Sequence, residues 1–165
     1  MPQTDLQGLF ADLGDIPAIT DAALVRQKSR DFHWFSPILK ADLRDRYAEA
    51  VVCPRNEAEV IRVAAACARR RVPLTARGAG TGNFGQAVPL AGGVVVEMTG
   101  LDQIKWFKLG AVRAEAGIRL TDLDAATRTQ GWELRMHPST KRMATLGGFI
   151  GGGYTHGEKP DSFRR

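Results

Sequence analysis

The sequence has few of the residues that cross-links, metal sites and membrane anchors require. Among its 165 residues there are only two cysteines, Cys53 and Cys67, both in apolar stretches. Neither a disulfide framework nor a cysteine-based metal site is therefore expected. No apolar run approaches the length that spans a bilayer, and residues 1–5 lack the basic start of a secretion signal. These absences predict a cytoplasmic protein with buried, reduced thiols and no membrane span.

The composition is that of an ordinary folded domain with an excess of positive charge. Hydrophobic residues make up 44% of the chain. The chain contains 23 Lys and Arg and 18 Asp and Glu, which gives a formal charge of +5. Such a charge suits an anionic partner, whether phosphate, acidic substrate or nucleic acid. The three arginines at 69–71 fit a helix end better than a nucleic-acid site, because no aromatic interleaving or reader motif accompanies them. No nucleic-acid partner is expected.

The middle of the chain predicts a β-α-β unit. Val51–Cys53 forms a β-branched run closed by Pro54, and Asn56 with Glu59 resembles a capping box that begins a helix. A second strand is expected over 72–76, with Pro73 at its start. Such a crossover joins parallel strands, at whose carboxyl ends ligands bind in open α/β sheets. The apolar helix positions expected to face the core are Val60, Ile61, Ala64, Cys67 and Ala68.

Further elements are expected on both sides of this unit. Residues 4–30 predict two short helices, the second capped by Thr20, and 32–37 predict a loop whose aromatics pack into the core. Strands are expected around Val94–Val96 and over 112–116. Thr121 is a candidate cap for a helix that runs to Gln130 and ends at Gly131. From Pro138 onward the glycine-rich chain predicts loop.

A glycine-rich loop follows the second strand. It reads Arg77-Gly78-Ala79-Gly80-Thr81-Gly82-Asn83-Phe84-Gly85. Such a backbone can turn sharply and direct several N–H groups at one anion, while the arginine adds charge and the threonine and asparagine add donors. A flexible turn without a ligand is the alternative. The position after a strand favours a cradle for a pyrophosphate.

Two common phosphate motifs do not describe this loop. Residues 80–85 match G-x-G-x-x-G literally, but the dinucleotide-binding form opens a helix, whereas Pro89 and Gly92-Gly93 follow here. The match is therefore weak evidence for NAD. A P-loop is absent as well, since no glycine run leads into Gly-Lys-Ser or Gly-Lys-Thr. What is left is a loop between two strands that binds phosphate through its backbone.

A second glycine-rich constellation lies near residue 150. It consists of His137-Pro138-Ser139-Thr140 and of 144–153, in which five of the seven residues 147–153 are glycines. The backbone there can approach a ligand closely, and the hydroxyls of Ser139, Thr140 and Thr145 are possible partners. Two converging glycine loops suit a large planar cofactor.

These motifs together resemble the FAD-binding domain of the FAD-linked oxidases. The stretches that carry the resemblance are 73–81, 89–95, Ala116-Gly117, and 138–140 with 145–148. The family is that of vanillyl-alcohol oxidase and p-cresol methylhydroxylase, with its glycolate oxidase and D-lactate dehydrogenase branch. The resemblance implies an α+β (α/β) fold with an N-terminal β-α-β subdomain and the start of a second, mixed or antiparallel β subdomain. It divides the chain into a helical lead-in (1–44), an incomplete FAD-binding domain (45–153) and a divergent polar tail (154–165).

The resemblance also implies which residues bind the cofactor. One set wraps the FAD pyrophosphate: Arg77, Gly78, Ala79, Gly80, Thr81, Gly82 and Asn83. The other set lines the cofactor from the opposite side: Pro138, Ser139, Thr145, Gly147 and Gly148. Some relatives attach flavin through a histidine in the first loop. Thr81 occupies that place here, so non-covalent FAD is expected.

The implied activity is hydride transfer from a 2-hydroxy acid or similar alcohol to FAD. In the family, a cap domain that follows the FAD-binding domain supplies the substrate pocket. Because only 154–165 follow here, we expect a truncated or split chain, with a partner polypeptide possible, and assign no catalytic residue to His33, His137 or His156. A non-catalytic FAD-binding or interaction module is the alternative, and a nucleic-acid binder is a more distant one.

Overall fold

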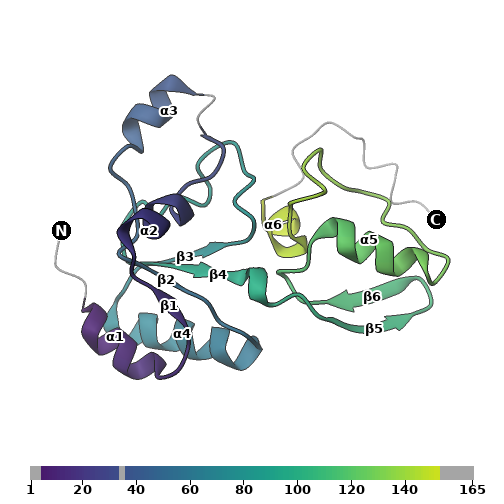
Figure 1. Ribbon diagram of the computed structural model, residues 1–165, viewed down its shortest axis with the longest axis horizontal. Helices are drawn as coiled ribbons and strands as arrows, with labels where there is room; N and C mark the ends of the chain where they lie inside the picture. Colours follow the sequence, from purple (N-terminus) through teal and green to yellow (C-terminus); the bar gives the residue numbers. More distant parts are fainter. Residues whose placement is uncertain (1–4, 34–35, 153–165) are drawn as a thin grey trace.

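The computed structural model describes residues 5–33 and 36–152, which form two lobes (Figure 1). The first lobe runs from helix α1 to strand β4, and a single 3-10 turn, η2 (Met98–Gly100), leads into the second. In Figure 1 the short helix α6 (Leu146–Gly151) lies between the two lobes. The mixed helix and strand content agrees with the predicted α+β class.

A four-stranded sheet forms the centre of the first lobe. Its strands are β1 (Ala18–Ile19), β2 (Ala50–Val52), β3 (Leu74–Arg77) and β4 (Val94–Glu97), in the order β1-β2-β4-β3. The strands β2 and β3 both pair in parallel with β4, while β1 is antiparallel to β2. Every residue of β2 and β4 is buried, as expected for β-branched runs covered on both faces. The predicted β-α-β unit is confirmed, with β4 inserted between its two strands.

Helices α1 (Leu6–Leu13) and α4 (Glu57–Arg70) pack together on this sheet. Their contact is part of a core of buried apolar side chains: Leu9, Leu13, Ile16, Ala50, Val52, Val63, Ala66, Cys67, Val72, Val94 and Val96. The predicted cap of α4 is present, because Asn56 Oδ1 accepts a hydrogen bond from Glu59 N–H at 3.0 Å.

The predicted apolar face of α4 was correct at Cys67, which is buried, and wrong at three other positions. Ile61 is 64% exposed, and Ala64 and Ala68 are exposed as well, while Val60 is half-buried. The other buried positions are Glu59, Val63 and Ala66. The buried face of α4 is hard to identify from the sequence because it includes a charged residue, Glu59. The Glu59 carboxylate lies inward because it accepts hydrogen bonds from both the backbone and the side chain of Arg55.

The lead-in forms more structure than the sequence predicts. Helix α2 (Ala22–Lys28) is capped by Asp21, whose side chain accepts from Leu24 N–H at 2.9 Å, and not by Thr20. A further helix, α3 (Pro37–Asp42), begins where a packed loop was expected. Proline cannot continue a helix, but it suits a first turn, and Ser36 caps this one. Of the predicted aromatic packing, Phe32 is 37% exposed, and Trp34 and Phe35 lie outside the described residues.

The second lobe consists of a β-hairpin and one helix. Strands β5 (Ile104–Lys108) and β6 (Ala111–Ala114) pair in antiparallel fashion, and α5 (Leu120–Arg128) follows. Strand β6 overlaps the predicted strand 112–116, whereas β5 was not predicted. Thr121 is not the cap of α5, because it lies within the first turn and the cap position is Arg119. After the helix, Gly131 has a φ of 77°, the left-handed conformation expected at such an end.

Helix α6 corrects the prediction of loop beyond Pro138. Thr145 precedes this six-residue helix, and its hydroxyl accepts a hydrogen bond from Gly148 N–H at 3.3 Å. The glycines conceal the helix in the sequence because glycine has a low helix propensity. The cap is the signal that could have revealed it.

Several smaller expectations concern cysteines, arginines and membrane spans. Cys53 and Cys67 are free, and burial raises the pKa of both thiols. The arginines at the end of α4 are more than solvated charges, because Arg70 Nε lies 2.8 Å from Asp12 Oδ2 on α1. Within the described residues, the structure contains no helix long and apolar enough to cross a membrane.

Candidate cofactor site between two glycine loops

The first glycine loop leaves the sheet at the carboxyl ends of β3 and β4. The parallel register places Arg77, the last residue of β3, directly beside Glu97, the last residue of β4. The loop therefore begins at the sheet edge where α/β folds bind ligands. No helix opens within 78–93, so the literal G-x-G-x-x-G match is not a dinucleotide-binding turn, as predicted.

Arg77 holds the start of this loop in place. Its Nη1 donates to Gly78 O at 2.9 Å, and its side chain is only 10% exposed. Gly80 has a φ of 69°, and a Cβ there would lie 2.2 Å from Arg77 Nη2. A side chain at Gly80 would thus displace the guanidinium. The buried Arg77 Nε has no hydrogen-bond partner among the described residues, which leaves a charged donor for a ligand.

The two glycine loops meet at Gly78. A Cβ on this residue would lie 2.2 Å from Thr145 Oγ1 and 3.7 Å from Gly148 Cα. Thr145 itself is 2% exposed. Only glycine permits so close an approach. The structure therefore brings together two segments that are far apart in the sequence and that were predicted to face the same cofactor.

Backbone hydrogen bonds fix the second loop against the segment that follows β6. Gly147 N–H donates to Ala116 O at 2.7 Å, and Leu146 N–H donates to Ile118 O at 2.9 Å. Arg119 and Thr145 also form an isolated antiparallel bridge. These bonds connect the start of α6 to the second lobe, so Gly78 contacts the second lobe through α6.

A polar cavity of about 750 Å³ opens beside this contact. Residues of both lobes line it: Gln27, Lys28, Arg77, Ala79, Glu97, Thr99, Asp102, Gly117, Arg119, Asp122, Arg142, Met143 and Thr145. Cationic side chains outnumber acidic ones in this lining, which favours an anionic ligand. Among the described residues, no group of three or more His, Cys, Asp and Glu could hold a metal ion.

Sequence reasoning missed a buried charged cluster in the wall of this cavity. Glu97 Oε2 lies 2.8 Å from Lys28 Nζ and 3.5 Å from Arg77 Nη1, and the Glu97 side chain is 6% exposed. Thr99 Oγ1 donates to Glu97 Oε1 at 2.8 Å. One signal could have found Glu97: an acidic residue ends a buried valine run at the edge where the glycine loop begins. No comparable signal marks Lys28.

Of the residues predicted for the site, Arg77, Ala79 and Thr145 line the cavity, and the others do not: Gly78, Gly80, Thr81, Gly82, Asn83, Pro138, Ser139, Gly147 and Gly148. Ala79 lines the cavity, and Gly82 O accepts a hydrogen bond from Phe32 N–H at 2.7 Å, so the lead-in contacts the loop. Thr81 is half-buried and Asn83 is exposed at the outer part of the loop. Pro138 and Ser139 do not line the cavity. Pro138 O closes a turn by accepting from Lys141 N–H at 3.0 Å.

Asp124 on α5 holds the turn at Pro138–Lys141 in place through an ion pair with Lys141. Its Oδ2 lies 2.7 Å from Lys141 Nζ, and its Oδ1 accepts from Leu134 N–H at 2.9 Å. The hydrogen bond from Lys141 and the one from Leu134 hold the pKa of Asp124 well below its ordinary value. Lys141 is therefore a structural cation, whereas Arg142 lines the cavity.

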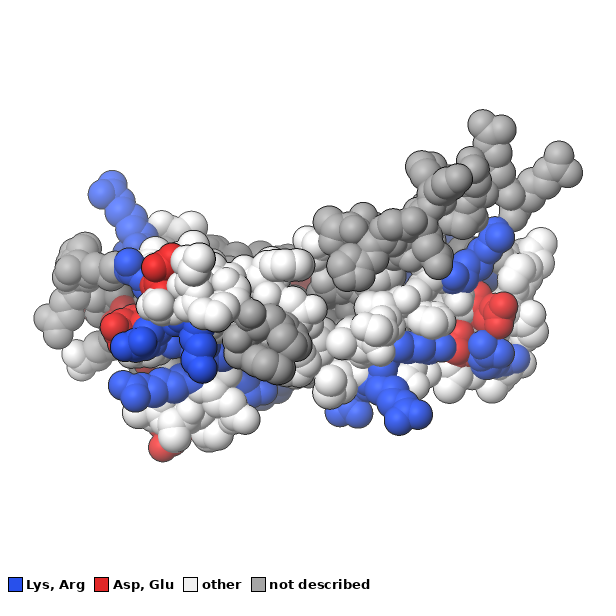
Figure 2. Space-filling model, turned by 90° about the horizontal axis from the view of Figure 1, so that it is seen from above, with Lys and Arg blue, Asp and Glu red and all other residues white. Residues whose placement is uncertain are grey.

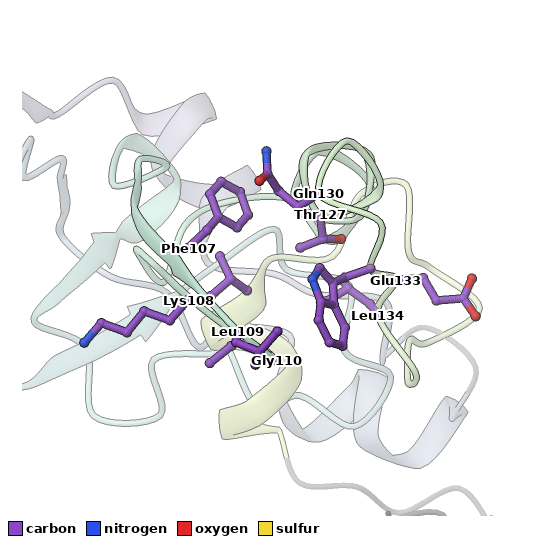
Figure 3. Close-up of a pocket in the computed structure, with 11 residues that line it drawn as sticks. Phe107, Lys108, Leu109, Gly110, Thr127, Gln130, Glu133 and Leu134 are labelled. Carbon is purple, nitrogen blue, oxygen red and sulfur yellow. The ribbon is translucent and has the colours of Figure 1, made fainter.

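A second cavity, of about 400 Å³, lies away from both loops (Figure 3). It separates the β5–β6 hairpin from the end of α5, and Phe107, Leu109 and Leu134 are among its lining residues. The Lys108 and Glu133 side chains extend outward on opposite sides of it. Neither glycine loop contributes residues to this space.

Positively charged side chains lie on both lobes on one face of the molecule. Figure 2 shows Lys and Arg side chains over both lobes on the face in view, with uncharged and acidic residues between them. On this face the excess charge forms no single continuous patch.

Comparison with known proteins identifies the family. A family model described as FAD binding domain matches residues 48–161. The glycolate oxidase subunit GlcD of Bacillus subtilis is 32% identical over 104 residues, which are 62% of this chain and 22% of that protein. A D-lactate dehydrogenase of Anaerostipes hadrus has the same identity and coverage. The chain thus spans about a fifth of the length of these relatives.

Solved structures show the same fold at lower identity. A 4-ethylphenol oxidase from Gulosibacter chungangensis superposes with a TM-score of 0.68 at 20% identity, over 87% of this chain and 27% of that one. An alkyldihydroxyacetonephosphate synthase gives a TM-score of 0.68 at 19% identity, over 81% and 28% of the two chains. The predicted fold is confirmed. The chain therefore belongs to the FAD-binding domain family of the FAD-linked oxidoreductases, with FAD as its cofactor.

Proposed function

We propose that this chain is the FAD-binding portion of an oxidoreductase that takes hydride from a 2-hydroxy acid or a similar alcohol. The observation that carries the proposal is the contact between the two glycine loops at Gly78 and Thr145, beside a polar cavity whose lining includes Lys28, Arg77, Arg119 and Arg142. An FAD site needs backbone at close range for the pyrophosphate and positive charge to neutralise it. Both requirements are met at this place.

The first loop is proposed to bind the pyrophosphate. The left-handed turn at Gly80 opens the backbone, and the unpartnered Nε of Arg77 supplies a charged donor at its start. The full set proposed is Arg77, Gly78, Ala79, Gly80, Thr81, Gly82 and Asn83. Because Thr81 has no nucleophilic nitrogen, the FAD is proposed to be non-covalent. Denaturation and filtration should then separate all flavin from the protein.

The second loop is proposed to line the cofactor from the other side. Thr145, Gly147 and Gly148 support this role directly, because they lie at or beside the contact with Gly78. Pro138 and Ser139 are proposed with less structural support, since they neither line the cavity nor lie at the contact with Gly78. They would reach the cofactor only at the edge of the site.

The proposed substrate class rests on the relatives. Those named glycolate oxidase subunit, D-lactate dehydrogenase and D-2-hydroxyglutarate dehydrogenase are named for 2-hydroxy acids. FAD, when bound, accepts the hydride from the carbon that bears the hydroxyl group, and loss of the hydroxyl proton to a base leaves a 2-oxo acid. The residues described here would hold the cofactor and exclude water from its phosphates. The base and the substrate contacts are assigned to no described residue.

Flavin binding tests the proposal directly. Purified chain should take up FAD, show flavin absorbance and quench flavin fluorescence. An Arg77→Met variant should bind FAD about tenfold more weakly, which corresponds to one charge-assisted hydrogen bond. Arg113→Met, which removes an exposed arginine on β6, is the matched control and should bind as the wild type does. Protein that stays colourless after refolding with excess FAD would refute the proposal.

A second candidate is a non-catalytic FAD-binding or interaction module. The exposed apolar residues of the second lobe favour it, since Leu109 is 93% exposed and Trp132 is 48% exposed. The two candidates differ in whether a substrate reduces the bound flavin. A catalytic portion, alone or with a partner polypeptide, should bleach its flavin on addition of a 2-hydroxy acid, whereas a binding module should not.

The division of the chain is proposed along the same lines. We propose a helical lead-in over 1–44, an FAD-binding domain over 45–153 and a polar tail over 154–165, the last outside the described residues. The cytoplasmic location stays a prediction from the sequence.

A further inference from the structure

The segment from Lys28 to His33 contacts the first glycine loop at one end and Glu97, the last residue of β4, at the other. It lies outside residues 48–161, which the family model matches. At one end Lys28 Nζ reaches Glu97, which also contacts Arg77. At the other end Phe32 N–H donates to Gly82 O at 2.7 Å. The lead-in therefore lies along the loop that is proposed to hold the pyrophosphate.

Lys28 is the last residue of α2, and its ammonium group lies in the cavity wall. The Nζ atom is 2.8 Å from Glu97 Oε2, and the side chain is 31% exposed. An ammonium group carries three donors, of which this ion pair uses one. Among the described residues, Glu97 is the only charged partner recorded for Lys28. Its other donors are available to a ligand in the cavity.

Glu97 explains why a lysine from a distant segment lies here. The carboxylate is 6% exposed and has Lys28 on one side and Arg77 on the other, at 2.8 and 3.5 Å. A buried carboxylate requires compensation by charge and hydrogen bonds. One carboxylate between two cations leaves the cluster positive. It therefore holds both cations at fixed positions in the cavity lining.

We propose that Lys28 is a cofactor-binding residue that places its positive charge against the pyrophosphate of FAD, so that the lead-in forms part of the cofactor site. This inference rests on the function proposed above, in which the first loop binds that pyrophosphate. Lys28 suits the role because its side chain is 31% exposed, whereas that of Arg77 is 10% exposed and donates to Gly78 O. Arg77 positions the loop, and Lys28 adds charge from the other side of the shared Glu97 carboxylate.

A buried pair anchors the other end of the same segment. Asp31 Oδ1 lies 2.8 Å from His33 Nδ1, and the two side chains are 0% and 6% exposed. Asp31 Oδ2 would be 3.2 Å from a Cβ at Gly82. The carboxylate thus packs directly on the loop. This contact keeps the lead-in in register with the loop, and so keeps Lys28 at the cavity.

The test measures affinity of the full chain for two flavins that differ in phosphate. Lys28→Met should lower the affinity for FAD about tenfold, because one charge-assisted contact is lost. The affinity for riboflavin, which has no phosphate, should stay unchanged. Lys40→Met, which removes an exposed lysine on α3, is the matched control and should change neither affinity. Equal FAD affinity of Lys28→Met and wild type would overturn the inference while leaving the proposed function intact.

A double variant separates binding from folding, since Lys28→Met alone leaves Glu97 with less compensation. Lys28→Met/Glu97→Gln removes the lysine together with the charge that it pairs. This variant should still bind FAD about tenfold more weakly than Glu97→Gln alone. FAD binding equal to that of Glu97→Gln would show that the lysine only neutralises the glutamate, which overturns the inference. Failure of the wild-type chain itself to bind FAD would overturn both the proposed function and this inference.

Discussion

The two lobes hold their glycine loops by different means. The first lobe contributes a sheet whose central strands β2 and β4 are buried along their whole length, so its loop starts from a closed core. In the second lobe four of the five residues of β5 are exposed, and its sheet has only two strands. There the loop is held by hydrogen bonds such as that from Gly147 N–H to Ala116 O at 2.7 Å.

This difference indicates where each wall of the site is rigid. Buried packing fixes Arg77 and Glu97 through the sheet register. Thr145 depends on a few backbone bonds and on the Asp124 contacts that hold the preceding turn. Loop positions supported by a packed sheet are more stable against local opening than those supported by exposed backbone bonds. Substitutions in each lobe can test this contrast.

Gly78→Ala should have the largest effect, because it acts where the lobes meet. Its Cβ would lie 2.2 Å from Thr145 Oγ1, so either the Thr145 side chain, which caps α6, or the two loops must shift. Overpacking of this kind costs about 1 to 3 kcal/mol, which corresponds to a loss of about ten- to a hundredfold in FAD affinity. Gly151→Ala is the control, since nothing lies within 4 Å of that Cβ. FAD titration of Gly78→Ala at wild-type affinity would contradict the contact.

A matched pair of valines compares the stability of the lobes. Val95→Ala in β4 removes a side chain that is 0% exposed, and should lower the free energy of unfolding by about 2 kcal/mol. Val112→Ala in the half-buried strand β6 should cost less than about 1 kcal/mol. Urea denaturation of both variants measures the difference. Equal losses would show that the hairpin is packed as tightly as the sheet.

Asp124→Asn should loosen the second wall and make stability depend on pH. The carboxylate is paired in the native state, so loss of its charge should cost about 1 to 2 kcal/mol at neutral pH. Because hydrogen bonds from Lys141 and Leu134 lower its pKa from 3.8, the stabilisation is complete above about pH 4 and decreases as pH falls below it. The difference in the free energy of unfolding between wild type and variant should therefore become smaller at acidic pH. Asp42→Asn, at an exposed position, should show no such trend.

Arg71→Gly should have the smallest effect and the opposite sign. Arg71 ends α4 with a φ of 54°, a left-handed conformation that glycine adopts more readily. The variant should gain about 0.5 to 1 kcal/mol in the first lobe. Arg69→Gly, in the helix and 62% exposed at its side chain, should instead lose about 1 kcal/mol. A higher thermal unfolding midpoint for Arg71→Gly and a lower one for Arg69→Gly would support the left-handed conformation of Arg71.

Much of the first lobe could be predicted from the sequence because its signals are local. The valine runs of β2 and β4 and the Asn56 cap of α4 identify a β-α-β unit without tertiary information. The buried face of α4 could not be predicted, because Glu59 lies inward through its bonds to Arg55. Strand β5 was missed because its apolar and charged residues are interspersed and four of its five residues are exposed.

The site, too, could be predicted from the sequence only where its signals are local. Both glycine loops could be predicted from composition, but their meeting at Gly78 and Thr145 depends on how two lobes pack. Lys28 could not be identified at all, since a lone lysine at a helix end carries no signal. Its neighbour Glu97 lies in a different segment, and only the fold brings the two within 2.8 Å.

The insertion of β4 between β2 and β3 has a consequence for how the chain folds during synthesis. Strands β2 and β3 leave the ribosome before the strand that joins them. Until Val94–Val96 emerges, β2 and β3 each have an edge whose backbone N–H and C=O groups lack the pairing that β4 provides. Lys28 of the lead-in likewise lacks its partner Glu97. Non-local pairing of this kind is slow and exposes aggregation-prone edges. Nascent chains that end before residue 94 should therefore be protease-sensitive, and protection should appear only once β4 has cleared the exit tunnel.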